Sequence, residues 1–156
     1  MVRLLFLLAF FFALTSSYAQ NAWTVQQIDS IVAVIDNSSF LQTFTKVDSS
    51  NFSKEAGKLP VYSYKKQKEG QIAKVERVGN GTCDSKEQFY FINGKLLKAV
   101  IIMTCSGSRT WHSELYFQND VAFALTDRVA PLYGPAFKQS GYSTLTRVVE
   151  IDSVKR

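Results

Sequence analysis

Two nearly identical stretches, QFYFING at Gln88–Gly94 and ELYFQND at Glu114–Asp120, lie 26 residues apart in the sequence. In each stretch a tyrosine alternates with apolar residues, and the chain then reaches a turn signal, Asn-Gly or Asn-Asp. Alternation of this kind is typical of a β-strand, whose successive side chains point to opposite faces of a sheet. Asn-Gly favours the tight turn of a β-hairpin. The repeat therefore predicts a sheet assembled from hairpins.

A third turn signal at Glu69-Gly70 places the expected hairpin turns 24 to 26 residues apart. Two strands of about eight residues and their turns fill such a period. The pattern predicts an antiparallel β-meander of about six to seven strands, including a weaker strand within residues 44–52. The run from Ala99 to Met103 is apolar at successive positions, which is typical of a strand covered on both faces.

A helix is expected before these strands. Thr24 is a candidate N-cap with Gln27 as its capping-box partner, and apolar residues then recur at helical spacing over residues 24–36. The apolar positions are Ile28, Ile31, Val32 and Ile35. This face favours packing on the sheet, and partner binding is the alternative interpretation.

A second helix is predicted near the C-terminus. Pro135 suits a first helical turn, and five later residues fit one helical face, although the segment VVEI also fits a strand. These residues are Phe137, Gly141, Leu145, Val148 and Val149. The predicted fold class is α+β, with an N-terminal helix packed on the meander.

The N-terminus has the parts of a secretory signal peptide. Arg3 precedes the apolar run LLFLLAFFFAL, and the small residues Ser17 and Ala19 follow it. We expect cleavage after Ala19, which leaves a single domain of residues 20–156. The apolar run is shorter than the roughly 20 residues that span a bilayer, and no later segment reaches that length. The sequence therefore predicts a soluble periplasmic or extracellular protein without membrane insertion.

The charge of the chain argues against nucleic-acid binding. The full sequence has a net charge of +5, and loss of Arg3 with the signal peptide reduces it to +4. A nucleic-acid surface is expected to concentrate arginine and lysine on one face. The lysines here include one cluster, Lys65, Lys66 and Lys68, with Lys54 and Lys58 nearby. We interpret them as solvated turn and edge positions, so no nucleic-acid partner is predicted.

Cys83 and Cys105, the two cysteines of the chain, flank the Asn93-Gly94 turn. In a hairpin with a two-residue turn they would be one residue out of register, and one β-bulge would bring them opposite each other. An exported protein meets an oxidising compartment. A structural disulfide is therefore the favoured interpretation, and two free thiols or a redox pair are the alternatives.

The sequence offers little for catalysis. His112 is the one histidine, which excludes a multi-histidine metal site. In two-residue register it would face Asp127, with Glu114 on the same face and Ser113 on the opposite one. A surface ion pair is the favoured interpretation of these residues. Nucleophile-elbow, phosphate-loop, dinucleotide and zinc-protease motifs are absent, so we predict a non-enzyme without metal or cofactor.

The succession of an N-terminal helix, GKLPVYSY, EQFYFINGKLLKA and SELYFQND resembles a group of small exported bacterial proteins with repeated YF-x-NG-x-L hairpins. The segment NGKL matches that form, whereas Asp120 and Ala122 depart from it in the second copy. The resemblance spans residues 28–127 and implies export and this scaffold, but it implies no catalytic residue. In a bacterial cell the sequons at Asn37, Asn51 and Asn80 would not carry glycans, whereas a eukaryotic secretory pathway would allow them.

Two functions fit these observations. The first is a binding module that holds a small apolar ligand or a partner on an aromatic sheet face formed by Tyr90, Tyr116 and Phe123. The second is a cell-envelope interaction or inhibitor protein that acts through its loops and a sheet edge. An open groove lined by the three aromatic residues would favour the first function. Their burial beneath a helix, with flat polar loops left exposed, would favour the second.

Overall fold

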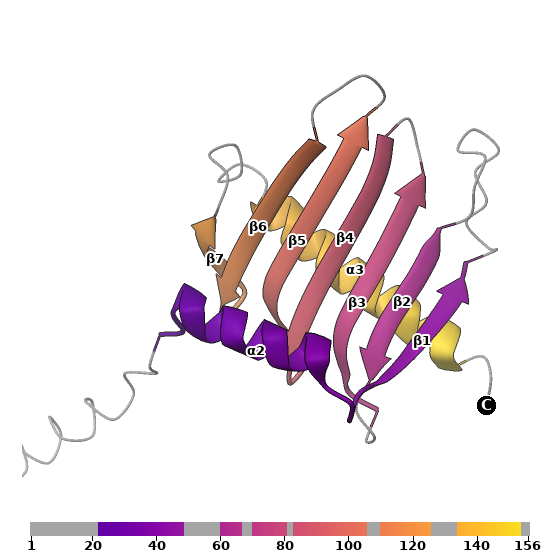
Figure 1. Ribbon diagram of the computed structural model, residues 1–156, viewed down its shortest axis with the longest axis horizontal. Helices are drawn as coiled ribbons and strands as arrows, with labels where there is room; N and C mark the ends of the chain where they lie inside the picture. The colour runs from indigo at the N-terminus through magenta and orange to yellow at the C-terminus, as the bar shows by residue number, and fades with distance from the viewer. Residues whose placement is uncertain are drawn as a thin grey trace, which may run out of the picture.

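The computed structural model describes residues 22–48, 60–66, 70–80, 83–105, 110–125 and 134–153. Within these residues, two helices flank seven strands in the sequence, and the strands form one antiparallel sheet in sequence order. The α+β meander is therefore confirmed. Helix α2 crosses one face of the sheet near its hairpin turns, and helix α3 crosses the opposite face (Figure 1). Neither described helix has the length and apolar character needed to cross a membrane.

The helices are α2 (Val25–Asn37) and α3 (Gly134–Ser153). The strands are β1 (Gln42–Val47), β2 (Val61–Lys66), β3 (Ile72–Asn80), β4 (Cys83–Ile92), β5 (Lys95–Cys105), β6 (Thr110–Gln118) and β7 (Val121–Leu125). The weak strand expected within residues 44–52 corresponds to β1, which begins slightly earlier. The predicted signal peptide and the sequon at Asn51 lie outside the described residues.

Two of the expected turns have the backbone of tight hairpins. Asn93 and Gly94 have φ angles of 50° and 74°, and Asn119 and Asp120 have φ angles of 48° and 64°. Positive φ at both central residues is the requirement of a type I′ turn, which matches the twist of the paired strands. Asn and Asp tolerate this left-handed region better than other non-glycine residues, so the second copy forms its turn without glycine.

Alternate residues of the repeat lie on opposite faces of the sheet, as predicted, and the structure places a helix on each face. Phe89, Phe91, Leu115 and Phe117 are at most 1% exposed and share a core cluster with Val148 of α3. The tyrosines of the repeat point to the other face, where they meet the isoleucines of α2. The sheet is therefore packed on both faces where the repeat lies.

Helix α2 begins at the predicted capping box. The backbone N–H of Gln27 donates to Thr24 Oγ1 at 3.2 Å, and the backbone N–H of Thr24 donates to Gln27 Oε1 at 2.9 Å. Ile28 is fully buried and Ile35 is 7% exposed. Packing on the sheet is thus the confirmed interpretation of this apolar face.

Helix α3 includes the segment VVEI, so the strand alternative is wrong. Gly141 allows the close approach of this helix to the sheet, because a Cβ atom there would lie 3.0 Å from Cδ1 of Phe89. The placement of Val149 on the apolar face is also wrong, since its side chain is 52% exposed. Ile151, two residues after Val149 and three after Val148, packs against the core instead.

Polar contacts link α3 to residues near the two edges of the sheet. Arg147 makes a bidentate ion pair with Asp48, just after β1, with both nitrogen–oxygen distances at 2.7 Å. Tyr142 donates a hydrogen bond to Asp120 in the β6–β7 turn and accepts one from the backbone N–H of Leu96 at 3.2 Å. A planar guanidinium fixes both the distance and the orientation of a carboxylate, so these contacts set the direction in which α3 crosses the sheet.

The register of β4 and β5 places the two cysteines opposite each other. Cys83 pairs with Cys105, their Cα atoms are 4.2 Å apart, and their sulfur atoms lie at disulfide distance. The register shifts at Leu97, which is the extra residue between the partners of Tyr90 and Phe91. This β-bulge supplies the one-residue offset that the sequence required.

Candidate functional site

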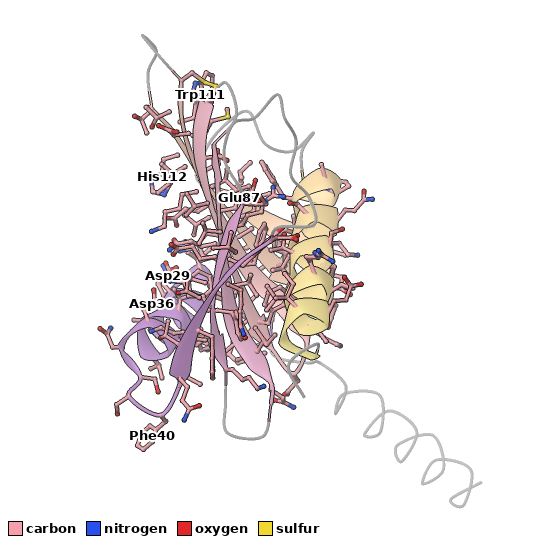
Figure 2. All side chains as sticks on the ribbon, turned by 90° about the vertical axis from the view of Figure 1, so that its right-hand side faces the viewer. Asp29, Asp36, Phe40, Glu87, Trp111 and His112 are labelled. Atoms are coloured by element: carbon pink, nitrogen blue, oxygen red, sulfur yellow. A yellow bond between two sulfur atoms is a disulfide. The ribbon has the colours of Figure 1, made fainter. Side chains whose placement is uncertain are left out.

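Helix α2 presents two aspartates to the sheet, Asp29 and Asp36. They are seven residues apart, which is about two helical turns, so they lie on the same side of the helix. Both are found on the α2 side of the sheet (Figure 2). Each aspartate contacts a lysine and a tyrosine that are cross-strand partners.

The first set, which we call the Asp36 site, comprises Asp36, Lys74 and Tyr90. Lys74 Nζ lies 2.7 Å from Asp36 Oδ1, and the Tyr90 hydroxyl donates to Asp36 Oδ2 at 3.0 Å. The Lys74 ammonium lies 4.9 Å from the centroid of the Tyr90 ring. Lys65 adds a hydrogen bond to the carbonyl of Ile35 at 3.1 Å, where a cation complements the C-terminal end of the helix.

The second set, the Asp29 site, comprises Asp29, Lys98 and Tyr116. Lys98 Nζ lies 2.7 Å from Asp29 Oδ1, and the Tyr116 hydroxyl lies 3.0 Å from the same oxygen. The Lys98 ammonium is 4.7 Å from the centroid of the Tyr116 ring. Glu114 completes the site: its Oε2 lies 2.8 Å from Lys98 Nζ and accepts a hydrogen bond of 2.8 Å from the Tyr116 hydroxyl.

The two sites are the structural counterpart of the sequence repeat. Lys74 pairs with Tyr90 across β3 and β4, and Lys98 pairs with Tyr116 across β5 and β6. Each pair of strands thus offers the same lysine–tyrosine surface, and α2 supplies one aspartate to each. The repeat therefore forms both the sheet and the lysine–tyrosine surface on which α2 packs.

Burial and charge shift the titration of these groups. Burial, together with Asp36, raises the pKa of Tyr90, and burial with hydrogen bonds to Glu114 and Asp29 raises the pKa of Tyr116 to about 12. Burial opposes the charge of Lys98, but its contacts with Asp29 and Glu114 prevail and raise its pKa. The pKa of Glu114 is raised by burial but lowered more by Lys98 and Tyr116, so that it lies below its usual value.

These shifts predict a loss of stability at alkaline pH. The unfolded chain releases its tyrosine protons near pH 10, whereas the folded protein retains that of Tyr116 up to about pH 12. The contribution of Tyr116 to the free energy of unfolding is therefore fully present below pH 10 and decreases as the pH rises toward 12. Thermal melts followed by circular dichroism should show that Tm decreases less between pH 10 and 12 in Tyr116→Phe than in the parent protein. An equal decrease in parent and variant would contradict this assignment.

Helix α2 covers part of the predicted aromatic face. Tyr90 and Tyr116 are each 2% exposed beneath α2, while Phe123 in β7 is 43% exposed. The rings of Tyr116 and Phe123 lie 6.5 Å apart, so these two residues do come together. A ligand would reach Tyr90 and Tyr116 only if α2 moved. Within the described residues, no fully buried side-chain polar atom lacks a hydrogen-bond partner.

His112 lies on the exposed part of the α2 side of the sheet (Figure 2). Its imidazole is 55% exposed, and Nε2 lies 3.3 Å from Glu114 Oε1. The predicted partner Asp127 lies outside the described residues. In the part of the chain that the structure describes, no three His, Cys, Asp or Glu side chains gather to hold a metal ion.

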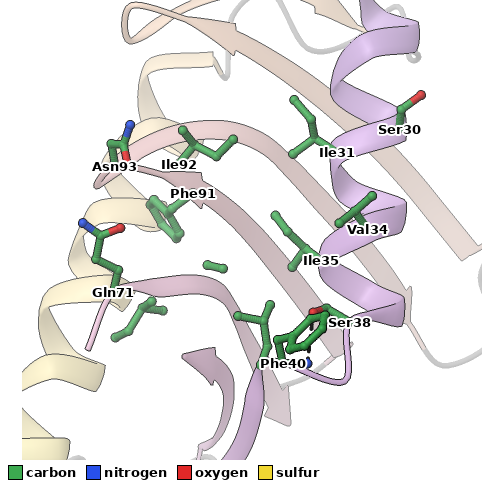
Figure 3. Close-up of a pocket in the computed structure, with 13 residues that line it drawn as sticks. Ser30, Ile31, Val34, Ile35, Ser38, Phe40, Gln71, Phe91, Ile92 and Asn93 are labelled. Atoms are coloured by element: carbon green, nitrogen blue, oxygen red, sulfur yellow. Dashed lines mark hydrogen bonds between the residues drawn. The ribbon is translucent and has the colours of Figure 1, made fainter. Parts of the chain in front are cut away.

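An apolar groove of about 750 Å³ opens beside α2, and we call it the first groove (Figure 3). Its walls come from α2 and the turn after it, from the start of β3, and from the end of β4. All of the described residues that line it are uncharged. Val34 and Phe40 line it and are 68% and 89% exposed. Ser38 Oγ accepts a hydrogen bond from the backbone N–H of Phe40 at 3.2 Å and so holds this turn against the groove.

A second groove of about 420 Å³ adjoins the first at Ile92 and Asn93. It lies between Trp23, which precedes α2, and the start of β5 and the end of β6. None of the predicted ligand-binding residues lines either groove. The sequence did not reveal these grooves because each combines segments that are far apart in the chain, although an aromatic residue in a polar turn, Phe40, was an available signal.

Comparisons with known proteins found no match to a family model, to a curated protein or to a solved structure. The resemblance to small exported bacterial proteins therefore stays a prediction, and function must be inferred from the residues of this chain.

Proposed function

We propose that this chain is an exported, non-catalytic binding protein whose first groove holds the apolar part of a small molecule. The observation that carries the proposal is a groove of about 750 Å³ that is lined by no charged residue of the described part of the chain. Pockets for small ligands commonly have volumes of about 300–1,000 Å³ and are mostly apolar with a few polar groups. The lining fits that description, since Ser30, Ser38, Gln71 and Asn93 lie among aliphatic and aromatic residues.

The exposure of the groove residues supports the same function. Phe40 and Val34 leave most of their apolar surface in water, so their side chains contribute little to the core. An exposed apolar patch next to a concavity is typical of a ligand or partner site. A bound apolar molecule would remove this surface from water, which is a favourable contribution of about 25 cal/mol per Å².

Export is part of the proposal. It is supported by the signal-peptide pattern of residues 1–19 and by Cys83 and Cys105 at disulfide distance. Stable disulfides are typical of oxidising compartments.

A cell-envelope interaction or inhibitor protein is the second candidate. The burial of Tyr90 and Tyr116 beneath α2 favours it. The sheet edge at β7 favours it too, because Val121 and Phe123 are 66% and 43% exposed there. An edge strand can add a strand from a partner. The bulge at Phe123 counts against this function, because bulges at sheet edges hinder strand addition.

The first groove can be tested with an uncharged probe that fluoresces in apolar surroundings, N-phenyl-1-naphthylamine. We expect saturable binding to the parent protein. Val34→Asp should lower the affinity at least about tenfold, because a carboxylate in an apolar groove loses hydration that the probe cannot replace. Binding is measured by fluorescence titration of the folded protein.

The matched control is Val149→Asp. Val149 is a half-exposed valine near the C-terminal end of α3, on the far side of the sheet. It receives the same charge in a similar helical position, so its affinity for the probe should equal that of the parent. Equal affinity of both variants and the parent, or no binding at all, would contradict the proposal.

A further inference from the structure

The two grooves adjoin each other, and together, as what we call the path, their lining reaches from one end of α2 to the other. Trp23 lines the second groove just before the helix, and Phe40 lines the first groove just after it. Both grooves include Ile92 and Asn93, at the turn between β4 and β5. Because α2 has 13 residues, this path is about 20 Å long at 1.5 Å per residue. An elongated occupant fits such a path better than a compact one.

Among the residues that the structure describes, charge is present at one end of the path alone. None of those that line the first groove is charged, and Lys95 is the charged residue among those that line the second groove. Lys95 is exposed at the start of β5, and no described carboxylate pairs with it. By contrast, Lys65, Lys74 and Lys98 are bonded to α2. The ammonium of Lys95 is therefore available to an anion.

We propose that the occupant is a single-chain amphiphile with an anionic head, of the fatty-acid class. Its carboxylate meets Lys95 in the second groove, and its alkyl chain passes Ile92 and lies in the first groove. This inference rests on the proposed function and names the ligand class for the same site. Asn93 and the other polar residues of the lining remain in contact with water at the edge of the path.

Chain length gives the first test. Octanoate, decanoate and dodecanoate are titrated against the parent protein by displacement of the uncharged naphthylamine probe, below their aggregation concentrations. Each additional buried CH₂ should increase the affinity about fourfold. Affinities that do not rise with chain length would overturn the inference, because the alkyl chain would then lie outside the groove.

The head group gives the second test. Dodecanoate should displace the probe at a lower concentration than dodecanol, which has the same chain without the charge. In Lys95→Gln this advantage should be lost, a decrease of about two- to fivefold for an exposed ion pair. The advantage should also shrink with added salt in the parent protein. Lys138→Gln, which removes a lysine of α3 outside both grooves, should behave as the parent does.

The outcomes separate this inference from the function on which it rests. Probe binding that depends on Val34, together with equal affinities for dodecanoate and dodecanol, would overturn the anionic amphiphile and leave the apolar site intact. An unchanged carboxylate advantage in Lys95→Gln would also overturn it. Binding to anionic phospholipid vesicles without displacement by dodecanoate would replace the free amphiphile with a membrane surface. A protein that binds no probe would refute both proposals.

Discussion

Replacement of Ile28 by alanine is expected to lower the free energy of unfolding by about 2–5 kcal/mol. Ile28 is fully buried, and it packs between α2 and the sheet with Leu97 and Tyr116. The substitution removes three methyl or methylene groups and leaves a cavity beside the Asp29 site. Urea denaturation followed by circular dichroism measures the change.

Val34→Ala is the matched control for this prediction, because Val34 lies in the same helix but is 68% exposed. Its effect should stay within about 0.5 kcal/mol, as for most surface substitutions. If Ile28→Ala lowered the free energy of unfolding as little as the control does, the apolar face of α2 would not pack on the sheet. The result would then support its interpretation as a partner-binding face.

Breaking a bond between Cys83 and Cys105 is expected to cost about 3 kcal/mol, the loop-entropy value for two residues at this spacing. The cysteines are 22 residues apart in sequence and are direct cross-strand partners. For a chain of this size the loss should lower Tm by about 10 °C. Thermal melts with and without reductant give the comparison, and the double variant Cys83→Ser, Cys105→Ser should match the reduced protein.

The bond itself is detected by mass. Alkylation of the denatured protein without reductant should add no alkyl group, and alkylation after reduction should add two groups. Two additions without reductant would show free thiols and would contradict the disulfide. Equal melting temperatures before and after reduction would contradict its stabilising role.

The sheet could be predicted because its determinants are local. Alternation in Phe89, Tyr90 and Phe91 fixes which side chains share a face, and the turn residues Asn93 and Gly94 fix where the strand reverses. These signals depend on neighbouring residues alone. They also brought the cysteines to within one residue of their true register.

The position of the bulge could not be predicted in the same way. The bulge at Leu97 adds one residue to β5 and satisfies the register of Cys83 and Cys105. Other positions in the hairpin would produce the same offset. Leu97 is 6% exposed and packs against α2, so the choice of this position depends on tertiary packing.

The two aspartate sites were not visible in the sequence for a related reason. Asp29 and Lys98 are 69 positions apart, and Asp36 and Tyr90 are 54 positions apart. The regular spacing of the lysines and tyrosines is present in the sequence, but nothing local shows which helix covers them. The covering of Tyr90 and Tyr116 by α2 is what moves the proposed ligand site from the tyrosines to the grooves beside the helix.

The most direct test of ligand binding in the first groove compares Phe40 and Phe123, the two phenylalanines that are exposed among the described residues. Phe40 lines the first groove, whereas Phe123 lies on β7 beside Tyr116. Titration with the uncharged naphthylamine probe should show a several-fold weaker affinity for Phe40→Ala and the parent affinity for Phe123→Ala. Weaker binding in Phe123→Ala with an unchanged affinity in Phe40→Ala would contradict a site beside α2 and would place the ligand on the aromatic sheet face.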